Sequence, residues 1–198
     1  PISVTMDLGQ SVMFNSNVSG GTPPYSYKWY LNDTAVSGAN ASTWTFTPNS
    51  TGFYTVYLNV TDSLNVKAKS NTASVTVNPA LSVSISPTSV TIDLGQSKTF
   101  NSTVSGGTPP YRYQWYSNNT AFPGANASTW TFIPASAGFY TVYLNVTDNI
   151  NATAKSNIAN VTVNPTLSVS ISPTSVTIDL GQSVTFQSTV ANGTSPYF

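Results

Sequence analysis

Residues 138–146 read Gly-Phe-Tyr-Thr-Val-Tyr-Leu-Asn-Val, and residues 52–60 carry the same nine letters. In the later stretch every second residue from Tyr140 to Val146 is apolar, which is the period of a strand with one buried face. Residues 81–85, 90–94, 111–115 and 159–163 alternate in the same way. About seven such short strands, separated by turn signals, predict an all-β, Greek-key β-sandwich.

The chain repeats itself with a period of 86 residues, because the motif Leu-Gly-Gln-Ser begins at Leu8, Leu94 and Leu180. We therefore expect three domains: residues 1–79 as a first repeat without its first strand, 80–165 as a complete repeat, and 166–198 as the opening strands of a third. The repeats are joined by about three residues that include one proline, which predicts a semi-rigid tandem array. Residues 167–171 could instead complete the first repeat of another molecule. Truncation of a longer array explains the ends more simply.

Several of these residues carry a resemblance to immunoglobulin-like (Ig-like) domains. Trp29 and Trp115 stand at the place of the buried tryptophan of the third strand, and Tyr54 and Tyr140 match the tyrosine corner. Residues 19–29 and 57–62 are similar to the polycystic-kidney-disease (PKD) type of Ig-like repeat. The resemblance implies tandem PKD-like sandwiches that serve extracellular spacing or adhesion on archaeal or bacterial cell surfaces.

The strand register predicts an exposed aromatic face. With Trp29 and Tyr54 pointing inward, their neighbours on the third and sixth strands should point outward and share one sheet face. Three interpretations remain open: lateral packing in a filament, stacking on sugars, or cover by a loop or glycan. The predicted contact face comprises Tyr30, Phe53, Tyr57 and their copies Tyr116, Phe139 and Tyr143.

Composition excludes several classes of function. The chain has six basic and six acidic residues, no His and no Cys. It therefore lacks the basic footprint of a nucleic-acid binder and a polybasic membrane-binding run. The usual catalytic bases and soft metal ligands are also missing. We therefore expect that the chain is not an enzyme and has neither a cofactor nor a metal site. We also expect its stability to change little between about pH 5 and 8.

Aspartates recur at matched positions, either before Leu-Gly or after Val-Thr. One interpretation is Ca²⁺ binding at domain junctions, and the other is capping of tight turns. A repeat with only two or three carboxylates favours capping. The residues are Asp7, Asp93 and Asp179 in the first group and Asp62 and Asp148 in the second.

Asparagine sequons are unusually frequent. Twelve of the twenty Asn residues begin an Asn-x-Ser/Thr triplet, where composition alone would give roughly six, which favours N-glycosylation and export. The sequons are Asn17, Asn32, Asn40, Asn49, Asn59, Asn101, Asn118, Asn126, Asn145, Asn151, Asn160 and Asn192.

Together these features predict a structural, non-enzymatic repeat segment of a glycosylated extracellular surface, surface-layer or filament protein. It would act as a semi-rigid spacer and assembly module. Its partners would be copies of itself along or between filaments or in a surface layer, and glycans, without nucleic acid or direct membrane contact. The alternative is a carbohydrate-binding adhesive module that uses the predicted contact face.

Overall fold

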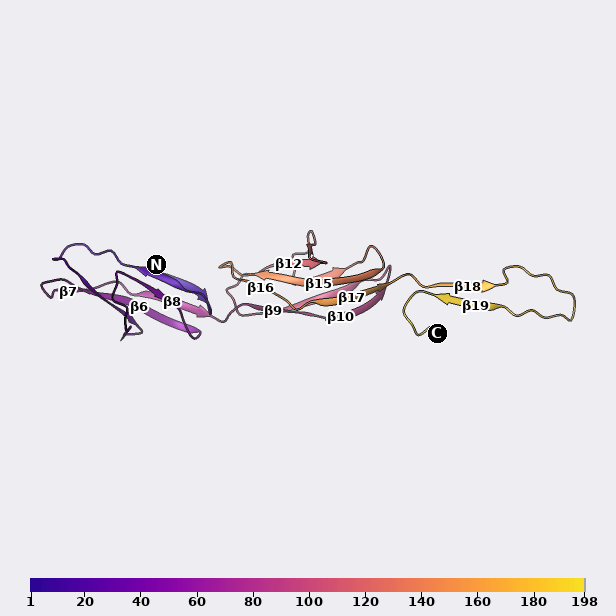
Figure 1. The fold of residues 1–198 in the computed structure, drawn as a ribbon, viewed down its shortest axis with the longest axis horizontal. Coiled ribbons are helices and arrows are strands. Elements are labelled where there is room, and N and C mark those ends of the chain that lie inside the picture. Colours follow the sequence, from indigo (N-terminus) through magenta and orange to yellow (C-terminus); the bar gives the residue numbers. More distant parts are fainter. Residues whose placement is uncertain (198) are drawn as a thin grey trace. The chain divides into compact units, whose positions relative to one another are not determined.

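The computed structural model describes residues 1–197 and shows an all-β protein of tandem Ig-like β-sandwiches (Figure 1). The chain divides into two compact units. The first contains residues 1–82, 104–112 and 146–154, and the second contains residues 83–103, 113–145 and 155 onward. In the described part of the chain, no helix has the length and apolar character needed to span a membrane.

The first repeat forms two sheets from eight strands. The larger sheet has the order β1-β8-β6-β3-β4 with β7 beside β6, and the smaller one pairs β2 with β5. β1 runs parallel to β8, and this register sets Asp7 opposite Asn78 at the ends of the two strands. The strands are β1 (Ser3–Asp7), β2 (Val12–Asn15), β3 (Ser26–Leu31), β4 (Thr34–Ala35), β5 (Thr43–Phe46), β6 (Gly52–Thr61), β7 (Lys67–Lys69) and β8 (Ala73–Asn78).

The second repeat has the same plan with one additional strand. Its sheets have the orders β10-β17-β15-β12-β13, with β16 beside β15, and β14-β11-β9. The strands are β9 (Ser82–Ser86), β10 (Ser89–Asp93), β11 (Lys98–Ser105), β12 (Arg112–Ser117), β13 (Thr120–Ala121), β14 (Thr129–Phe132), β15 (Gly138–Thr147), β16 (Thr153–Lys155) and β17 (Ala159–Asn164). Beyond them, β18 (Ser168–Ser172) and β19 (Gln187–Ala191) form an antiparallel pair, drawn in yellow in Figure 1.

Pro87 marks the point where the chain changes sheets. β9 before it pairs with β11, whereas β10 after it pairs with β17 in the other sheet. A proline is tolerated here because it interrupts no continuous ladder of hydrogen bonds. The two alternating stretches on either side of Pro87 therefore form two strands, one in each sheet.

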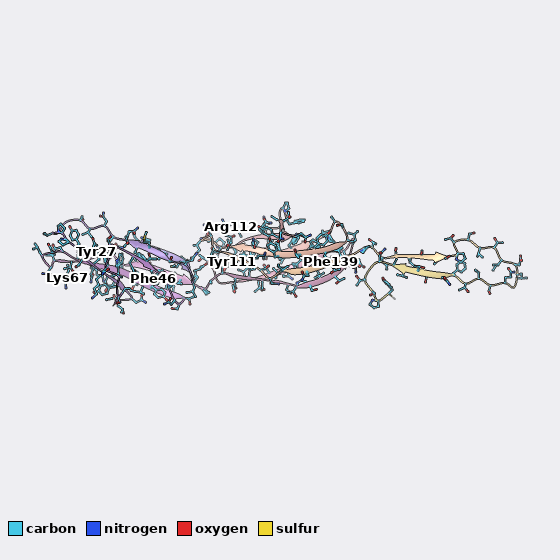
Figure 2. All side chains as sticks on the ribbon, in the orientation of Figure 1. Tyr27, Phe46, Lys67, Tyr111, Arg112 and Phe139 are labelled. Atoms are coloured by element: carbon cyan, nitrogen blue, oxygen red, sulfur yellow. The ribbon has the colours of Figure 1, made fainter. Side chains whose placement is uncertain are left out.

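The cores follow the predicted register. In the first repeat Trp29 is only 4% exposed, and Phe46 and Val75 are buried around it. Tyr27 and Phe46, both labelled in Figure 2, belong to the same packed group, Tyr27 at its partly buried edge. In the second repeat Trp115 is fully buried. The indole therefore forms the centre of each sandwich.

The tyrosine corner is confirmed in both copies. The hydroxyl of Tyr54 donates a 2.8 Å hydrogen bond to the carbonyl oxygen of Ser50, and Tyr140 makes the same 2.8 Å bond to Ser136. Each bond joins the start of a central strand to the loop four residues before it. This is the feature that the Ig-like resemblance implied.

Candidate functional site

A group of polar side chains gathers at the ends of β1 and β8, within the first unit. The Nδ2 of Asn78 donates to the hydroxyl oxygen of Thr108 at 2.9 Å, and that hydroxyl donates to Oδ1 of Asp7 at 3.0 Å. The backbone N–H of Thr108 donates to Oδ2 of Asp148 at 2.8 Å. We call Asp7, Asn78, Thr108 and Asp148 the aspartate cluster. It links two strand ends of the first repeat to the segments 104–112 and 146–154, each of which contains the loop between two strands of the second repeat.

Both carboxyl groups of the cluster are shielded from water. Asp7 is 2% exposed and Asp148 is 0% exposed. Asp148 accepts two further backbone hydrogen bonds on Oδ1, from Ala152 at 2.8 Å and from Ile150 at 3.1 Å. Oδ2 of Asp7, in contrast, is buried without a hydrogen-bond partner. The two carboxylates therefore have very different surroundings.

These surroundings shift the pKa values of the two side chains in opposite directions. Burial, followed by the neighbouring carboxyl group of Asp148, raises the pKa of Asp7 above its ordinary value. Burial acts in the same sense on Asp148, but the hydrogen bond from the Thr108 N–H, the neighbouring carboxyl group of Asp7 and the hydrogen bonds from the N–H groups of Ala152 and Ile150 outweigh it and lower its pKa. Asp148 is thus the ionised member of the pair, and Asp7 is the member that holds a proton more readily.

Two glycines allow the loop 106–111 to approach the chain that leaves β8. The N–H of Gly107 donates to the carbonyl oxygen of Pro79 at 2.8 Å. Gly106 and Gly107 have φ angles of 66° and 69°, a region that side chains rarely adopt. A Cβ on Gly106 would meet the backbone of Ala80, and one on Gly107 would lie 2.8 Å from Cδ1 of Leu81. The loop therefore fits only without side chains at these positions.

Part of this arrangement recurs 86 residues later, within the second unit. The Nδ2 of Asn164 donates to the hydroxyl oxygen of Thr194 at 3.0 Å, and Thr194 donates to Oδ1 of Asp93 at 2.7 Å. The N–H of Gly193 again donates to a proline carbonyl oxygen, that of Pro165, at 2.9 Å. The same hydrogen-bonded contact is thus built twice from the repeated sequence.

Asp62, the equivalent of Asp148 in the first repeat, accepts the same backbone hydrogen bonds but has no second carboxyl group beside it. Its Oδ2 accepts from Thr22 at 3.0 Å and its Oδ1 from Leu64 and Val66 at 3.0 and 2.8 Å. The N–H groups of Thr22 and Val66 lower its pKa. The turn-capping interpretation therefore holds for Asp62 and Asp148. No group of three acidic, His or Cys side chains that could hold a metal ion occurs within residues 1–197.

The predicted contact face is only partly an exposed surface. Phe53 and Phe139 are each 84% exposed, which confirms that they point outward. Tyr30 lies opposite Tyr57 on neighbouring strands, and the two rings stack with centroids 4.8 Å apart. Phe53 lies four residues before Tyr57 on β6, beyond the part of β6 that pairs with β3, and is opposite Thr76 of β8. The six residues therefore do not form one continuous aromatic patch on each repeat.

The prediction that Tyr57 and Tyr143 are exposed is wrong. They are 9% and 7% exposed, because a lysine side chain from the neighbouring strand, β7 or β16, lies over each ring. The Nζ atoms of Lys69 and Lys155 lie 3.7 and 3.8 Å from the ring centroids of Tyr57 and Tyr143. The ammonium groups are held over the faces of the rings by cation–π attraction. Burial and the charge of Asp33 raise the pKa of Tyr57.

Ten of the twelve sequon asparagines are exposed, and two are half-buried. The exposed ones are Asn17, Asn32, Asn40, Asn49, Asn101, Asn118, Asn126, Asn151, Asn160 and Asn192. Asn59 and Asn145 are half-buried, and Oδ1 of Asn145 is buried without a hydrogen-bond partner. Asn32 and Asn118 also stabilise the fold, since their Oδ1 atoms accept hydrogen bonds from the N–H groups of Thr55 and Thr141 at 2.8 and 2.9 Å.

Three comparisons with known proteins agree with this architecture. A family model described as SprB repeat matches residues 103–120, a stretch that contains Thr108 and Trp115. The chain is 27% identical over 151 residues to the "Highly immunogenic outer capsid protein" of Enterobacteria phage T4, covering 71% of this chain and 40% of that protein. It is 37% identical over 82 residues to the "Decoration protein" of Escherichia phage T5, covering 40% of this chain and 49% of that protein.

The chain thus spans less than half the length of the curated relatives it matches. Among solved structures, a three-Ig segment of titin, domains I67–I69, is similar with a TM-score of 0.56 and 17% identity. That match covers 97% of this chain and 85% of the titin chain, and it shows the fold alone. The chain is a tandem array of Ig-like β-sandwich domains, and its residues 103–120 are similar to the SprB repeat.

Proposed function

We propose that this chain is a non-catalytic spacer and assembly segment of a glycosylated protein displayed on an extracellular surface or filament. The observation that carries the proposal is the recurrence of one hydrogen-bonded contact, Asn78–Thr108–Asp7 and Asn164–Thr194–Asp93, at a spacing of one repeat. Repeats that meet through the same contact each time would give an array with defined spacing. We also propose that the repeats are of the PKD-like type.

Surface display has separate support. Ten exposed sequons suit N-glycosylation, and similar Ig-like sequences occur in an outer capsid protein and a decoration protein of phages. The proposed partners are copies of the same chain along or between filaments, or its neighbours in a surface layer. An archaeal or bacterial surface is the setting that the PKD-like resemblance favours.

The carbohydrate-binding alternative receives less support from the site. A sugar-stacking platform needs an accessible aromatic ring face. The rings of Tyr57 and Tyr143 are instead covered by lysine side chains. Phe53 and Phe139 are accessible, but they lie four residues along the strand from Tyr57 and Tyr143, outside the Tyr30–Tyr57 and Tyr116–Tyr143 stacks.

The test of surface display uses intact native cells. Antibodies raised against the 198-residue chain should label intact cells, and the native protein should exceed the mass of its polypeptide by the mass of attached glycans. Labelling only after the cells are permeabilised, together with a bare polypeptide mass, would contradict the proposal.

A further inference from the structure

The two buried carboxyl groups of the aspartate cluster present an electrostatic problem. Asp7 and Asp148 are close enough to perturb one another, and both are at least 98% buried. Two ionised carboxylates at such a site would repel one another without water to screen them. Something must therefore neutralise one of the two charges when the cluster is closed.

The hydrogen bonds identify which carboxyl group is neutralised. Asp148 accepts three backbone N–H groups, from Thr108, Ile150 and Ala152, and this arrangement favours a carboxylate. Asp7 accepts only the Thr108 hydroxyl on Oδ1, and its Oδ2 is buried without a partner. A proton on Oδ2 of Asp7 would convert this orphaned atom into a donor toward the carboxylate of Asp148.

We propose that Asp7 and Asp148 share one proton, and that this proton closes the aspartate cluster and makes the contact between repeats dependent on pH. Asp7 supplies the proton through Oδ2 and remains neutral, while Asp148 remains ionised. This proposal deepens the spacer function and rests on it, since the contact it controls is the one that we propose sets the spacing of the array.

A bound cation explains the same site less well. Ca²⁺ takes six to eight oxygen ligands, but the oxygens of Asp148 already accept three N–H groups and the Thr108 hydroxyl already donates to Asp7. Only Oδ2 of Asp7 is buried and free of a partner within the cluster. A single proton satisfies that atom and removes the repulsion at once.

Other charged groups near the cluster are few. On the segment 104–112, the hydroxyl of Tyr111 donates to the carbonyl oxygen of Gly106 at 2.7 Å, and Nη2 of Arg112 donates to Oδ1 of Asn151 at 2.9 Å. Both side chains are labelled in Figure 2. The segments 78–82 and 146–154 carry one titratable side chain, Asp148 itself. Titration of the cluster therefore belongs to the Asp7–Asp148 pair.

The sign of the pH effect follows from the direction of each shift. The raised pKa of Asp7 stabilises the closed cluster below the ordinary value of 3.8, and this contribution is lost as pH rises through the raised value. The lowered pKa of Asp148 acts oppositely, since its contribution is present above 3.8 and is lost as pH falls through the lowered value. The cluster is therefore most stable near pH 3.8, becomes less stable as pH rises toward the raised pKa of Asp7, and has lost the Asp7 contribution above that value.

The first experiment is a carboxyl ¹³C NMR titration of the whole chain, with a blocked aspartate peptide as the external reference. We expect the Asp7–Asp148 pair to titrate in two apparent steps, one below and one above the ordinary aspartate value of 3.8. A pair that titrates together with the reference peptide would overturn the proposal. A pair that stays ionised until EDTA is added, and whose shifts respond to added Ca²⁺, would show a cation in place of the proton.

The second experiment uses two isosteric variants with opposite expected effects. Asp7→Asn replaces the protonated carboxyl group with a neutral amide that can still donate to Asp148. Hydrogen exchange of the Gly107 amide, which we expect to accelerate at high pH in the wild type, should therefore remain slow in this variant. Asp148→Asn removes the acceptor and should accelerate exchange at every pH. Asp93→Asn is the control, because the described part of the chain pairs Asp93 with Thr194 and not with a second carboxyl group. If Asp7→Asn opens the cluster as much as Asp148→Asn does, the shared proton is refuted.

These outcomes are distinct from failure of the spacer proposal. A normal titration of Asp7 would remove the proton but leave the hydrogen bonds of Asn78 and Thr108, and hence the spacer function, intact. Loss of coupling between the repeats at every pH, with the pair still titrating in two steps, would remove the spacer function alone.

Discussion

The indole N–H of Trp115 donates a 2.9 Å hydrogen bond to the carbonyl oxygen of Ala127, and Trp29 makes the same 2.9 Å bond to Ala41. Each indole is buried at the centre of its sandwich, where an unpaired N–H would be costly. The tryptophan therefore fixes a loop as well as filling the core.

Replacing either tryptophan should strongly destabilise its own repeat. Trp115→Ala removes a fully buried side chain, which costs about 3–5 kcal/mol of unfolding free energy. Chemical denaturation measures the loss. Phe139→Ala is the control, since that ring is 84% exposed and its removal should change stability by less than about 0.5 kcal/mol. A loss below about 1 kcal/mol for Trp115→Ala would mean that the strand register is wrong.

A single asparagine side chain bonds β9 to the rest of the second repeat. Oδ1 of Asn157 accepts from the N–H of Ile85 at 2.8 Å, and its Nδ2 donates to the carbonyl oxygen of Ile85 at 3.1 Å. Asn157→Ala should cost about 1–3 kcal/mol, because it leaves backbone groups of Ile85 unpaired. Within the described residues the first repeat has no strand equivalent to β9 beside Asn71, so Asn71→Ala should be nearly neutral in the same thermal melts. Equal losses would show that the bond to Ile85 contributes little.

Two glycine variants separate the effect of the close contact at Gly107 on stability from the effect of its left-handed backbone conformation. Gly107→Ala places a Cβ 2.8 Å from Leu81 in a backbone with φ of 69°, whereas Gly124→Ala has φ of 76° and open space. Both pay about 1–2 kcal/mol for the left-handed conformation, and Gly107→Ala should lose about 1–3 kcal/mol more through the clash. Unfolding curves that coincide for the two variants would refute the close approach.

Glycan occupancy should follow exposure. We expect glycans at the matched exposed sequons Asn40 and Asn126, and none at the half-buried Asn145, whose Oδ1 is enclosed. Glycopeptide mapping of the native protein measures each site. A fully occupied Asn145 would contradict the packing around it, and an unmodified protein would contradict glycosylation as a whole.

Sequence alone predicted the sandwich and its inward residues well. Alternation of period two fixes which residues of β6 and β15 face the core, and Val56, Leu58, Val142 and Leu144 are all buried there. It failed at Tyr57 and Tyr143 because the pattern assigns a side to each residue but says nothing of what covers that side. A lysine on the neighbouring strand provides the cover.

The aspartate cluster could be predicted only in part. Recurrence marked Asp7 and Asp148, and turn capping was the favoured interpretation. Their juxtaposition depends on contacts between residues 101 positions apart, such as Thr108 with Asp7, which no local pattern encodes. The expectation that stability changes little with pH rested on there being no strongly shifted aspartate, and burial of Asp7 now supplies a raised pKa.

The proposed spacer function requires successive repeats to keep a defined relation in solution, and ¹⁵N relaxation of the 198-residue chain tests this requirement most directly. The amides of β3, β6 and β8 should report the same rotational correlation time as those of β12, β15 and β17. A variant with Gly-Ser-Gly-Ser inserted between Pro79 and Ala80 should give shorter and separate values for the two groups. Wild-type values as short and as separate as those of the insertion variant would contradict the spacer account.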